Sequence, residues 1–409
     1  MGEDGLHHVT APIGVTIETL IYLLDSLGLV YPPNPTEKSA FLGGNLSTHA
    51  SGKWSFRFGS LRKYIYRIRL VLPSGDVLEL IRGECRVKQY IELESVEGES
   101  VELRLPIYST PRVRKSSAWP NIGIGDDLID FFIGMDGILG VYSEVELTPP
   151  NKPPNIYSIF SIIGDEDNLL QAVYELRRYS DRYGVWAVEF MDHRCLEFIK
   201  DRIGRSFPNI ESGGVLYIDV AGGDDIFDNL SGVNDILEAA GSIDTYASDD
   251  PRWLEEAMRI RHLVPESVNN FIARHGTHRV ASDASVPDDR LGDVLSLYSE
   301  FGDEAGIDYL IYGHIGDSHL HFNFLPRNSG EIELAMRYLT MMLSEIVSWG
   351  GSVTAEHGFG KKKFLDEDGE YRPLILLQYG DEAVEDVRDL KSTVDPRYIL
   401  NVGNIIGPE

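Results

Sequence analysis

The chain has 409 residues, of which 43% are hydrophobic and 25% are charged, as in an ordinary globular protein with a sizeable core. Acidic residues number 65 and basic residues 37, so the formal net charge is −28. This charge argues against nucleic-acid binding and against an electrostatic hold on anionic lipid, since both need a basic face.

The first third of the chain is predicted to be rich in short β-strands. Residues 9–13 are typical of a strand, and residues 16–27 repeat apolar side chains at helical spacing. Two apolar runs, 66–72 and 77–80, flank the turn sequence PSGD, which predicts a hairpin. The segment TPPNKPP at 148–154 places four prolines in seven residues, so we expect a domain junction there.

After the junction, strands and helices alternate in two β-α-β units, which predicts a ferredoxin-like sheet with helices on one side. The strands are expected over 156–163, 185–191, 215–220 and 243–248, and the helices over 167–179 and 226–240. Further helices are predicted over 253–275, 289–305 and 381–391, and further strands over 307–312, 320–325 and 352–357.

Seven of the eleven histidines lie between His262 and His357. In GHIGDSHLHFN, a strand-turn-strand segment would bring His314 and His321 together, and two imidazoles across a hairpin can bind a divalent cation. His319 shares a strand face with His321. Asp317 could orient a metal-binding imidazole without binding the metal itself. Structural histidines whose hydrogen bonds are satisfied within the fold, or surface histidines, are an equally good interpretation of this spacing.

The segment TAEHGFG follows and supplies Glu356 and His357. A carboxylate would complete a metal site with open positions for a substrate. Adjacent residues of a strand point to opposite faces, so both side chains could serve one site only if the backbone turns there. Gly358 and Gly360 favour such a turn.

Two glycine-rich segments, GGNLSTHASG at 43–52 and FIGMDGILGV at 132–141, lie between apolar runs. Glycine lets backbone N–H groups approach a phosphate closely, but neither segment is a GxxxxGKS loop or a GxGxxG motif. Tight turns are the simpler interpretation.

The cell compartment is indicated by what the sequence lacks. Cys85 and Cys195 form neither a CxxC motif nor a disulfide framework, which fits a cytoplasmic protein. The chain start shows no signal peptide, and no apolar stretch reaches about 18 residues, so no transmembrane segment is expected.

Taken in order, the motifs resemble one known family. YPPNP, GGNLSTHASG, VLPSGDVLEL, FFIGMDGILGV, AVEFMD, VASDASVP, GHIGDSHLH, GGSVTAEHGFGKKK and DPRYILNVGNI follow one another along nearly the whole chain. This set resembles the FAD-linked oxidases of the vanillyl-alcohol-oxidase superfamily, which carry a PCMH-type FAD domain. Within them it is most similar to the D-lactate dehydrogenase, glycolate oxidase and D-2-hydroxyglutarate dehydrogenase branch.

The resemblance implies an α+β fold. Residues 1–149 would be an FAD-binding domain of which only the second subdomain is present. Residues 150–390 would be a substrate cap built on a ferredoxin-like antiparallel sheet, and residues 391–409 would return to the FAD domain.

The resemblance also implies roles for single residues. The metal, a divalent ion such as Zn, Mn or Fe, would be held by His314, His321 and Glu356. His357 matches the catalytic base of the family. Arg261 falls close to the position of the family arginine that binds the substrate carboxylate. Residues expected to line the FAD are Gly43, Gly44, Asn45, Ser47, Ala50, Gly52, Gly134, Asp136, Gly137, Gly140 and Asn401.

Three departures from the family pattern concern single residues or pairs. His319 replaces the asparagine of GDGNLH, and Met135-Asp136 replaces a serine-glutamate pair. Ala281 stands where some relatives carry a basic residue, two positions before the aspartate of the DxSxP segment. The substrate is therefore not simply 2-hydroxyglutarate.

A larger departure concerns the start of the chain. Family members begin with a subdomain holding a glycine-rich loop of the RGGGTS type, whereas residues 7–29 here already match the strand and helix that follow it. A misplaced start, a partner polypeptide that supplies the missing FAD subdomain, and weak FAD binding are the three interpretations.

We therefore expect FAD-dependent, metal-assisted oxidation of a small D-2-hydroxy acid of the lactate or glycolate type, with an unidentified electron acceptor. One alternative is a subunit of a split or multi-subunit oxidase, cytoplasmic or held at a membrane surface through its partner. The other is an enzyme like alkylglycerone-phosphate synthase, which uses FAD without net oxidation.

Overall fold

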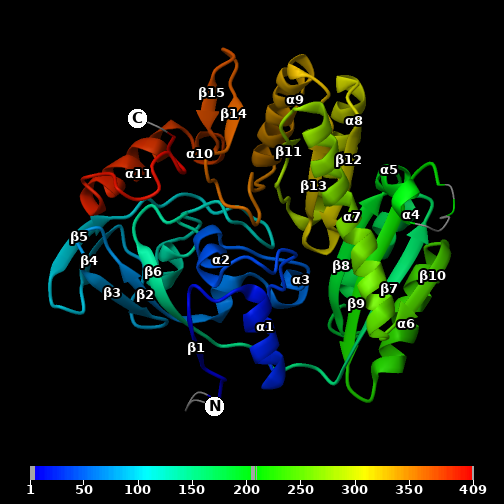
Figure 1. The fold of residues 1–409 in the computed structure, drawn as a ribbon, viewed down its shortest axis with the longest axis horizontal. Coiled ribbons are helices and arrows are strands. Elements are labelled where there is room, and N and C mark those ends of the chain that lie inside the picture. Colours follow the sequence, from blue (N-terminus) through cyan, green and yellow to red (C-terminus); the bar gives the residue numbers. More distant parts are fainter. Residues whose placement is uncertain (1–4, 204–207, 209, 408–409) are drawn as a thin grey trace. The chain divides into compact units, whose positions relative to one another are not determined.

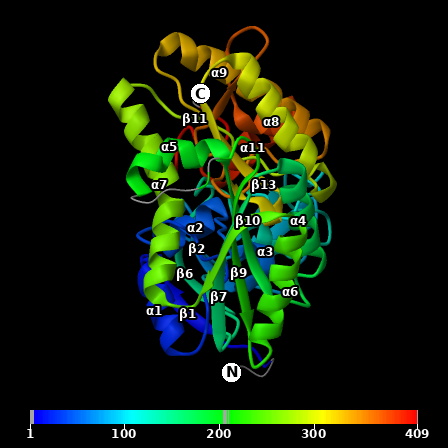
Figure 2. The ribbon, with the colours of Figure 1, turned by 90° about the vertical axis from the view of Figure 1, so that its right-hand side faces the viewer.

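The structure is a computed structural model that describes residues 5–203, 208 and 210–407. Figures 1 and 2 show its elements in two views. The chain divides into two compact units. Unit 1 comprises Met1–Gly52, Gly59–Lys152 and Gly350–Glu409, and unit 2 comprises Lys53–Phe58 and Pro153–Trp349.

The main sheet of unit 1 is antiparallel, with the strand order β1-β6-β2-β3. Its strands are β1 (Val9–Pro12), β2 (Ile65–Val71), β3 (Val77–Ile81) and β6 (Val141–Leu147). The predicted hairpin is confirmed, because β2 pairs with β3 across the PSGD turn with Val71 opposite Val77. Ile68 and Leu70 of β2 are buried, as the alternation of a half-buried strand requires.

The helices of unit 1 are α1 (Ile17–Ser26), α2 (Leu42–Thr48), α10 (Leu374–Tyr379) and α11 (Asp381–Val394). The Thr16 hydroxyl caps α1 by accepting from the Thr19 N–H, and the helix buries Leu20 and Leu24. Smaller elements are η1 (Leu61–Tyr64), η2 (Leu128–Phe132), and the hairpins of β4 (Tyr90–Glu94) with β5 (Ser100–Arg104) and β14 (Lys363–Leu365) with β15 (Tyr371–Pro373).

A buried lysine fixes the C-terminal tail to unit 1. Lys391 of α11 is 2% exposed and pairs with Asp395. Its ammonium also donates to the carbonyl oxygens of Ile138 and Leu400, each at 2.7 Å. These bonds hold the tail against the segment that contains the second glycine-rich motif.

Unit 2 is built on one long antiparallel sheet with the order β10-β7-β9-β8-β12-β13-β11. Its strands are β7 (Asn155–Ile163), β8 (Val185–Asp192), β9 (Gly214–Gly222), β10 (Ser242–Ser248), β11 (Val280–Ala281), β12 (Tyr309–His314) and β13 (His319–Phe324). The part β10-β7-β9-β8, with a helix after the first and third strands in sequence, is the predicted ferredoxin-like arrangement.

The helices of unit 2 are α3 (Ser55–Phe58), α4 (Glu166–Arg178), α5 (His193–Ile203), α6 (Ile226–Ala239), α7 (Pro251–His275), α8 (Leu291–Ala305) and α9 (Ser329–Ser348). Helices α5 and α7 bury Leu196, Ile199 and Val264 against Phe160 of β7 and Tyr217 of β9. Because Tyr217 pairs directly with Glu189 of β8, the side chain of Glu189 points to the same face of the sheet.

The short segment with α3 is tied to this sheet although unit 1 surrounds it in sequence. Lys53 pairs with the buried Asp219 of β9 at 2.7 Å, and the Trp54 indole N–H donates to the same carboxylate at 2.7 Å. Trp54 also packs edge-on against Trp186 of β8.

Two local predictions are wrong. Residues 352–357 form isolated bridges and bends in place of the predicted strand, and Gly358 and Gly360 follow with φ of +65° and +51°, which an extended strand excludes. The first glycine-rich segment contains a helix, α2, where turns were the simpler interpretation. Helices α3, α5, α9 and α10 and strands β6, β11, β14 and β15 were not predicted.

The contact-based units are drawn differently from the predicted domains, whose limits stay a prediction. Residues 350–390 belong to unit 1, whereas the sequence placed them in the cap with residues 150–349. Among the residues that the structure describes, no helix has the length and apolar character needed to cross a membrane.

Candidate active site

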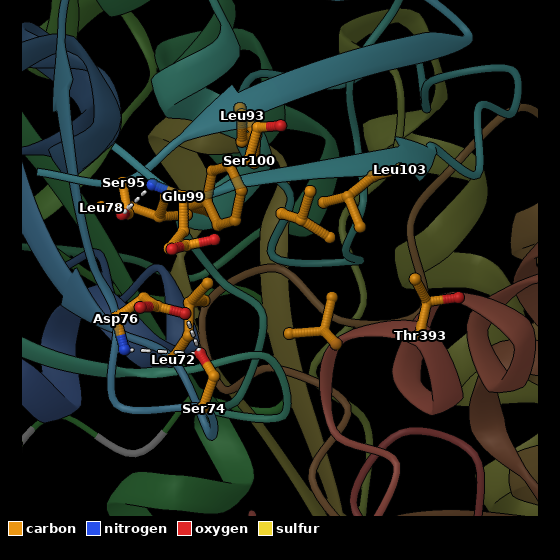
Figure 3. Close-up of a pocket in the computed structure, with 13 residues that line it drawn as sticks. Leu72, Ser74, Asp76, Leu78, Leu93, Ser95, Glu99, Ser100, Leu103 and Thr393 are labelled. Carbon is orange, nitrogen blue, oxygen red and sulfur yellow. Dashed lines mark hydrogen bonds between the residues drawn. The ribbon is translucent and has the colours of Figure 1, made fainter. Parts of the chain in front are cut away.

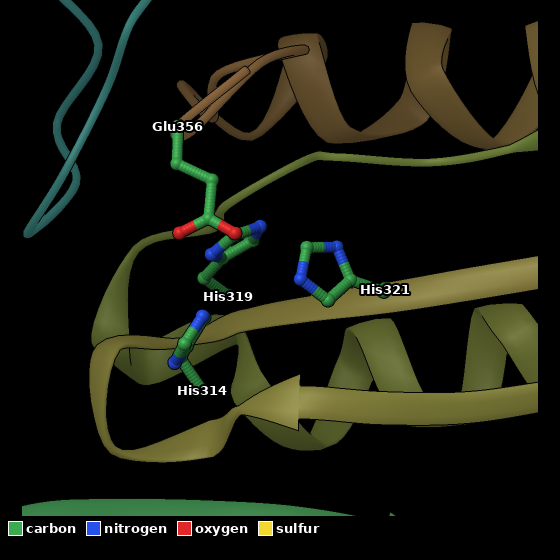
Figure 4. A group of neighbouring side chains, drawn as sticks. All are labelled: His314, His319, His321 and Glu356. Atoms are coloured by element: carbon green, nitrogen blue, oxygen red, sulfur yellow. The ribbon is translucent and has the colours of Figure 1, made fainter. Parts of the chain in front are cut away.

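Three histidines of unit 2 meet at the mouth of the β12–β13 hairpin. The strand register places His314 directly opposite His319, and His321 lies two residues further along the same face. The ring centroids are 5.3 Å apart for His314–His319, 4.5 Å for His319–His321 and 5.8 Å for His314–His321. All three side chains are buried, and Figure 4 shows their rings converging. Glu356, also drawn there, belongs to unit 1.

Two carboxylates that the sequence did not assign to this place contact the imidazoles. Glu189 Oε1 lies 2.6 Å from His314 Nδ1, and Asp283 Oδ1 lies 3.0 Å from His319 Nε2. The β8–β12 register explains the first contact, since Tyr312 pairs with Met191 and two further residues bring His314 beside Glu189. A carboxylate on one imidazole nitrogen fixes the ring and makes the other nitrogen a better ligand.

Arg261, the predicted substrate-binding arginine, reaches the same carboxylate from α7. Its Nε donates to Glu189 Oε2 at 2.8 Å, and its Nη2 contacts the same oxygen. Burial alone would raise the pKa of Glu189, but Arg261 and His314 outweigh burial and hold the pKa well below its ordinary value. Glu189 is therefore an ionised link between Arg261 and His314.

Glu356 and His357 lie together in the bent segment of unit 1. His357 Nε2 is 3.6 Å from Glu356 Oε1, so the two adjacent side chains turn toward one another, as the glycines after them suggested. Glu356 Oε2 accepts from Ser51 Oγ at 3.1 Å and contacts Lys115 Nζ at 3.3 Å. Ser51 and Lys115 were not predicted, and their distance from Glu356 in sequence explains why.

The two glycine-rich segments meet in unit 1. The N–H of Gly134 donates to the Leu46 carbonyl at 2.9 Å, and that of Asp136 donates to the Ser47 carbonyl at 2.8 Å. Asn401 donates through its side chain to the Asp136 carbonyl, which adds the C-terminal tail to the same group. All the residues that the resemblance assigned to FAD therefore belong to this unit.

Several of these glycines are needed for packing. A Cβ at Gly52 would lie 2.4 Å from the Pro33 carbonyl oxygen, and one at Gly140 would lie 2.6 Å from Leu70. A Cβ at Gly43 would lie 3.1 Å from Ile13, whereas one at Gly44 would meet nothing within 4 Å. Gly44 is thus the glycine of α2 that close packing does not require.

His49 offers a buried polar atom beside these segments. Its Nδ1 is 3.0 Å from the Ser116 carbonyl, so Nδ1 carries the proton and Nε2 is an acceptor. Nε2 is buried and has no hydrogen-bond partner among the described residues. Burial, reinforced by the positive charge of Arg62, holds the pKa of His49 well below its ordinary value. A neutral, buried acceptor of this kind fits a polar ligand such as a flavin cofactor.

Asp136 makes a testable contribution to stability. Its Oδ2 accepts from the Gly360 N–H at 2.7 Å, yet burial raises its pKa from 3.8 to about 6. The folded state favours the protonated acid. The contribution of Asp136 to the free energy of unfolding is therefore complete below about pH 4 and is lost as pH rises through 6. Asp136→Asn should keep the hydrogen bond and remove this fall, about 3 kcal/mol for two pKa units. Urea unfolding at pH 4 and pH 7 measures this fall in the free energy of unfolding. An equal change between the two pH values in the wild type and in Asp136→Asn would contradict the assignment.

A pocket in unit 1 lies apart from these residues. Its walls come from β3, β4, β5 and α11, and Figure 3 shows the lining side chains. Leu78, Leu93 and Leu103 make it largely apolar, while Ser74 donates to Asp76 at 2.6 Å. None of the predicted site residues lines it, so we assign it no part in catalysis.

Two stretches of the chain match known families. Residues 153–405 match the family described as FAD linked oxidases, C-terminal domain, and residues 3–81 match the FAD binding domain family. The first match alone spans more than half of the chain. The chain therefore belongs to the FAD-linked oxidases, which are flavin-dependent oxidoreductases.

Individual relatives agree with this placement. The chain is 25% identical to a D-lactate dehydrogenase of Archaeoglobus fulgidus over 96% of this chain and 76% of the relative. It is 24% identical to the glycolate oxidase subunit GlcD of Bacillus subtilis over 100% of this chain and 77% of the relative. A solved alkyldihydroxyacetonephosphate synthase aligns with a TM-score of 0.58 at 18% identity, over 98% of this chain and 64% of that one, which shows a shared fold alone.

These matches confirm the family resemblance, the α+β fold and the flavin oxidoreductase class. The metal, the residue roles, the domain limits, the partner polypeptide and the cytoplasmic location stay predictions.

Proposed function

We propose that this protein oxidises a small D-2-hydroxy acid of the lactate or glycolate type to the 2-keto acid. The observation that carries the proposal is the buried group of His314, His319 and His321, backed by carboxylates, in a chain of the FAD-linked oxidase family. The similarity to a D-lactate dehydrogenase and to a glycolate oxidase subunit supports this substrate class.

The residues have distinct parts in the proposal. His314 and His321 hold a divalent metal, and Glu356 joins them on the strength of the motif resemblance. The chemistry supplied by the bound groups is polarisation of the substrate hydroxyl by the metal and acceptance of the C2 hydride by FAD. His357 takes the hydroxyl proton, and its half-exposed ring leaves room for a substrate to approach.

Arg261 is the candidate for the substrate carboxylate, because a guanidinium binds a carboxylate through two N–H groups. In the structure these N–H groups contact Glu189. A substrate carboxylate would therefore either bind Arg261 together with Glu189 or replace Glu189 as its partner. The synthase alternative rests on a shared fold alone, and a split oxidase stays a second interpretation of the sequence.

Removing the metal tests the proposal directly. We expect the FAD-loaded protein to reduce a dye acceptor with D-lactate or glycolate, and not with L-lactate. Dialysis against a chelator should lower this rate by at least about 100-fold, since the metal would supply several kcal/mol to the proton transfer. Added Zn²⁺ or Mn²⁺ should restore it. Full activity after chelation would contradict the metal, and no turnover of any 2-hydroxy acid would contradict the substrate class.

A further inference from the structure

We propose that His319 is itself a metal ligand, so that unit 2 presents three imidazoles to a transition-metal ion of the zinc, cobalt or iron(II) class. The inference rests on the metal centre proposed above. It adds a ligand to that centre and narrows the class of metal.

The strand pairing brings the three imidazoles to one place without help from another part of the chain. His314 and His319 face one another across the hairpin, and His321 follows on the same face. The candidate ligand atoms of the three residues lie within 4.8 Å of one another. His319 is 0% exposed and its ring is the closer neighbour of both others.

The carboxylates that contact the imidazoles repeat the arrangement found at metal-bound histidines, where one ring nitrogen binds the metal and the other is held by a carboxylate. Glu189 contacts Nδ1 of His314, which points Nε2 of that ring toward the cluster. Asp283 contacts Nε2 of His319, so Nδ1 would be the nitrogen that binds a metal. A carboxylate that holds one imidazole nitrogen raises the donor strength of the other.

A structural role for His319 would need only the Asp283 contact. That one contact does not explain why a second buried imidazole, His314, has a carboxylate of its own at 2.6 Å while the two rings stack at an interplanar angle of 29°. A shared cation between the rings accounts for both carboxylates and for the close approach of the imidazoles.

Three nitrogen donors narrow the metal. Imidazole suits Zn²⁺, Co²⁺, Fe²⁺ and Ni²⁺, whereas Mn²⁺ and Mg²⁺ prefer oxygen ligands. Replacing His319 by asparagine exchanges a nitrogen donor for a weaker oxygen donor of similar reach. The loss should therefore be large for Co²⁺ or Zn²⁺ and small for Mn²⁺.

X-ray absorption of the Co²⁺-loaded protein at the cobalt edge tests the proposal without any substitution. Three imidazole ligands are expected, and two would overturn the role of His319. Absence of imidazole ligands or of bound Co²⁺ would overturn the proposed metal centre as well, so the two failures are distinguishable.

Titration of His319→Asn with Co²⁺ and with Mn²⁺ gives the second measurement. Co²⁺ affinity should fall at least about tenfold, with a changed visible cobalt spectrum, while Mn²⁺ affinity changes by less than about threefold. His275→Asn, at the exposed end of α7, is the matched control. Unchanged Co²⁺ affinity and spectrum in His319→Asn would overturn the proposal. If that variant does not fold, the ligand count in the wild-type protein decides alone.

Discussion

Replacing His357 by alanine is expected to leave the fold intact and to lower turnover by about 10²- to 10⁴-fold, the usual contribution of a positioned general base. The side chain is 50% exposed, so its loss removes little packing and should change stability by less than about 0.5 kcal/mol. Steady-state rates with D-lactate or glycolate measure the effect, and thermal unfolding checks the fold.

Two comparisons separate a base from a structural residue. His278→Ala removes another exposed histidine, on a segment of unit 2, and should leave turnover unchanged. Imidazole added to the His357→Ala protein should restore part of the rate, because a free base can enter the space left by the ring. A variant with wild-type turnover, or one that loses its bound metal, would contradict the assignment of His357 as a base.

The sequence predicted most regular elements because their signals are local. The PSGD turn between two apolar runs gave β2 and β3, and the β-α-β rhythm gave the order of the ferredoxin-like part. The strand over 352–357 failed because SVTAEH has strand composition, whereas Thr354 bonds to Ser117, 237 residues away, which composition does not indicate. Helix α9 could have been found, since Ala335, Leu339 and Leu343 recur at helical spacing.

From residue spacing alone, the site was predictable only where its residues share a hairpin. His314, His319 and His321 lie within one short motif, so the strand period places them on one face. Glu189 is 125 residues from His314, and their contact depends on how β8 pairs with β12. Lys115 is 241 residues from Glu356, and neither its spacing nor its neighbours in sequence indicate that partner.

Replacing Glu189 by glutamine is expected to destabilise the protein by about 3–5 kcal/mol, as breaking a buried ion pair does. The carboxylate is 2% exposed and accepts from both Arg261 and His314. Glutamine keeps the shape but offers one acceptor oxygen and turns an NH2 group toward one of two donors. Urea unfolding measures the loss. Glu256→Gln removes an exposed partner of Arg259 on α7 and should cost at most about 1 kcal/mol.

The pH dependence and a second substitution identify the cause. Since the pKa of Glu189 is held below its ordinary value of 4.5, its contribution is complete above about pH 4.5 and is lost as pH falls toward the lowered pKa. The stability gap between wild type and Glu189→Gln should therefore narrow only in acid, and a gap independent of pH would contradict an ionised carboxylate.

Adding Arg261→Met should recover part of the stability, because it removes the buried guanidinium that Glu189→Gln leaves uncompensated. The same double variant should not recover metal affinity, which should stay about 10- to 100-fold lower than in wild type, since His314 has still lost the carboxylate that orients its ring. Stability and metal affinity that recovered together would mean that Glu189 serves the fold alone. Recovery of stability without metal affinity would show that one buried carboxylate supports both the fold of unit 2 and the geometry of its histidines.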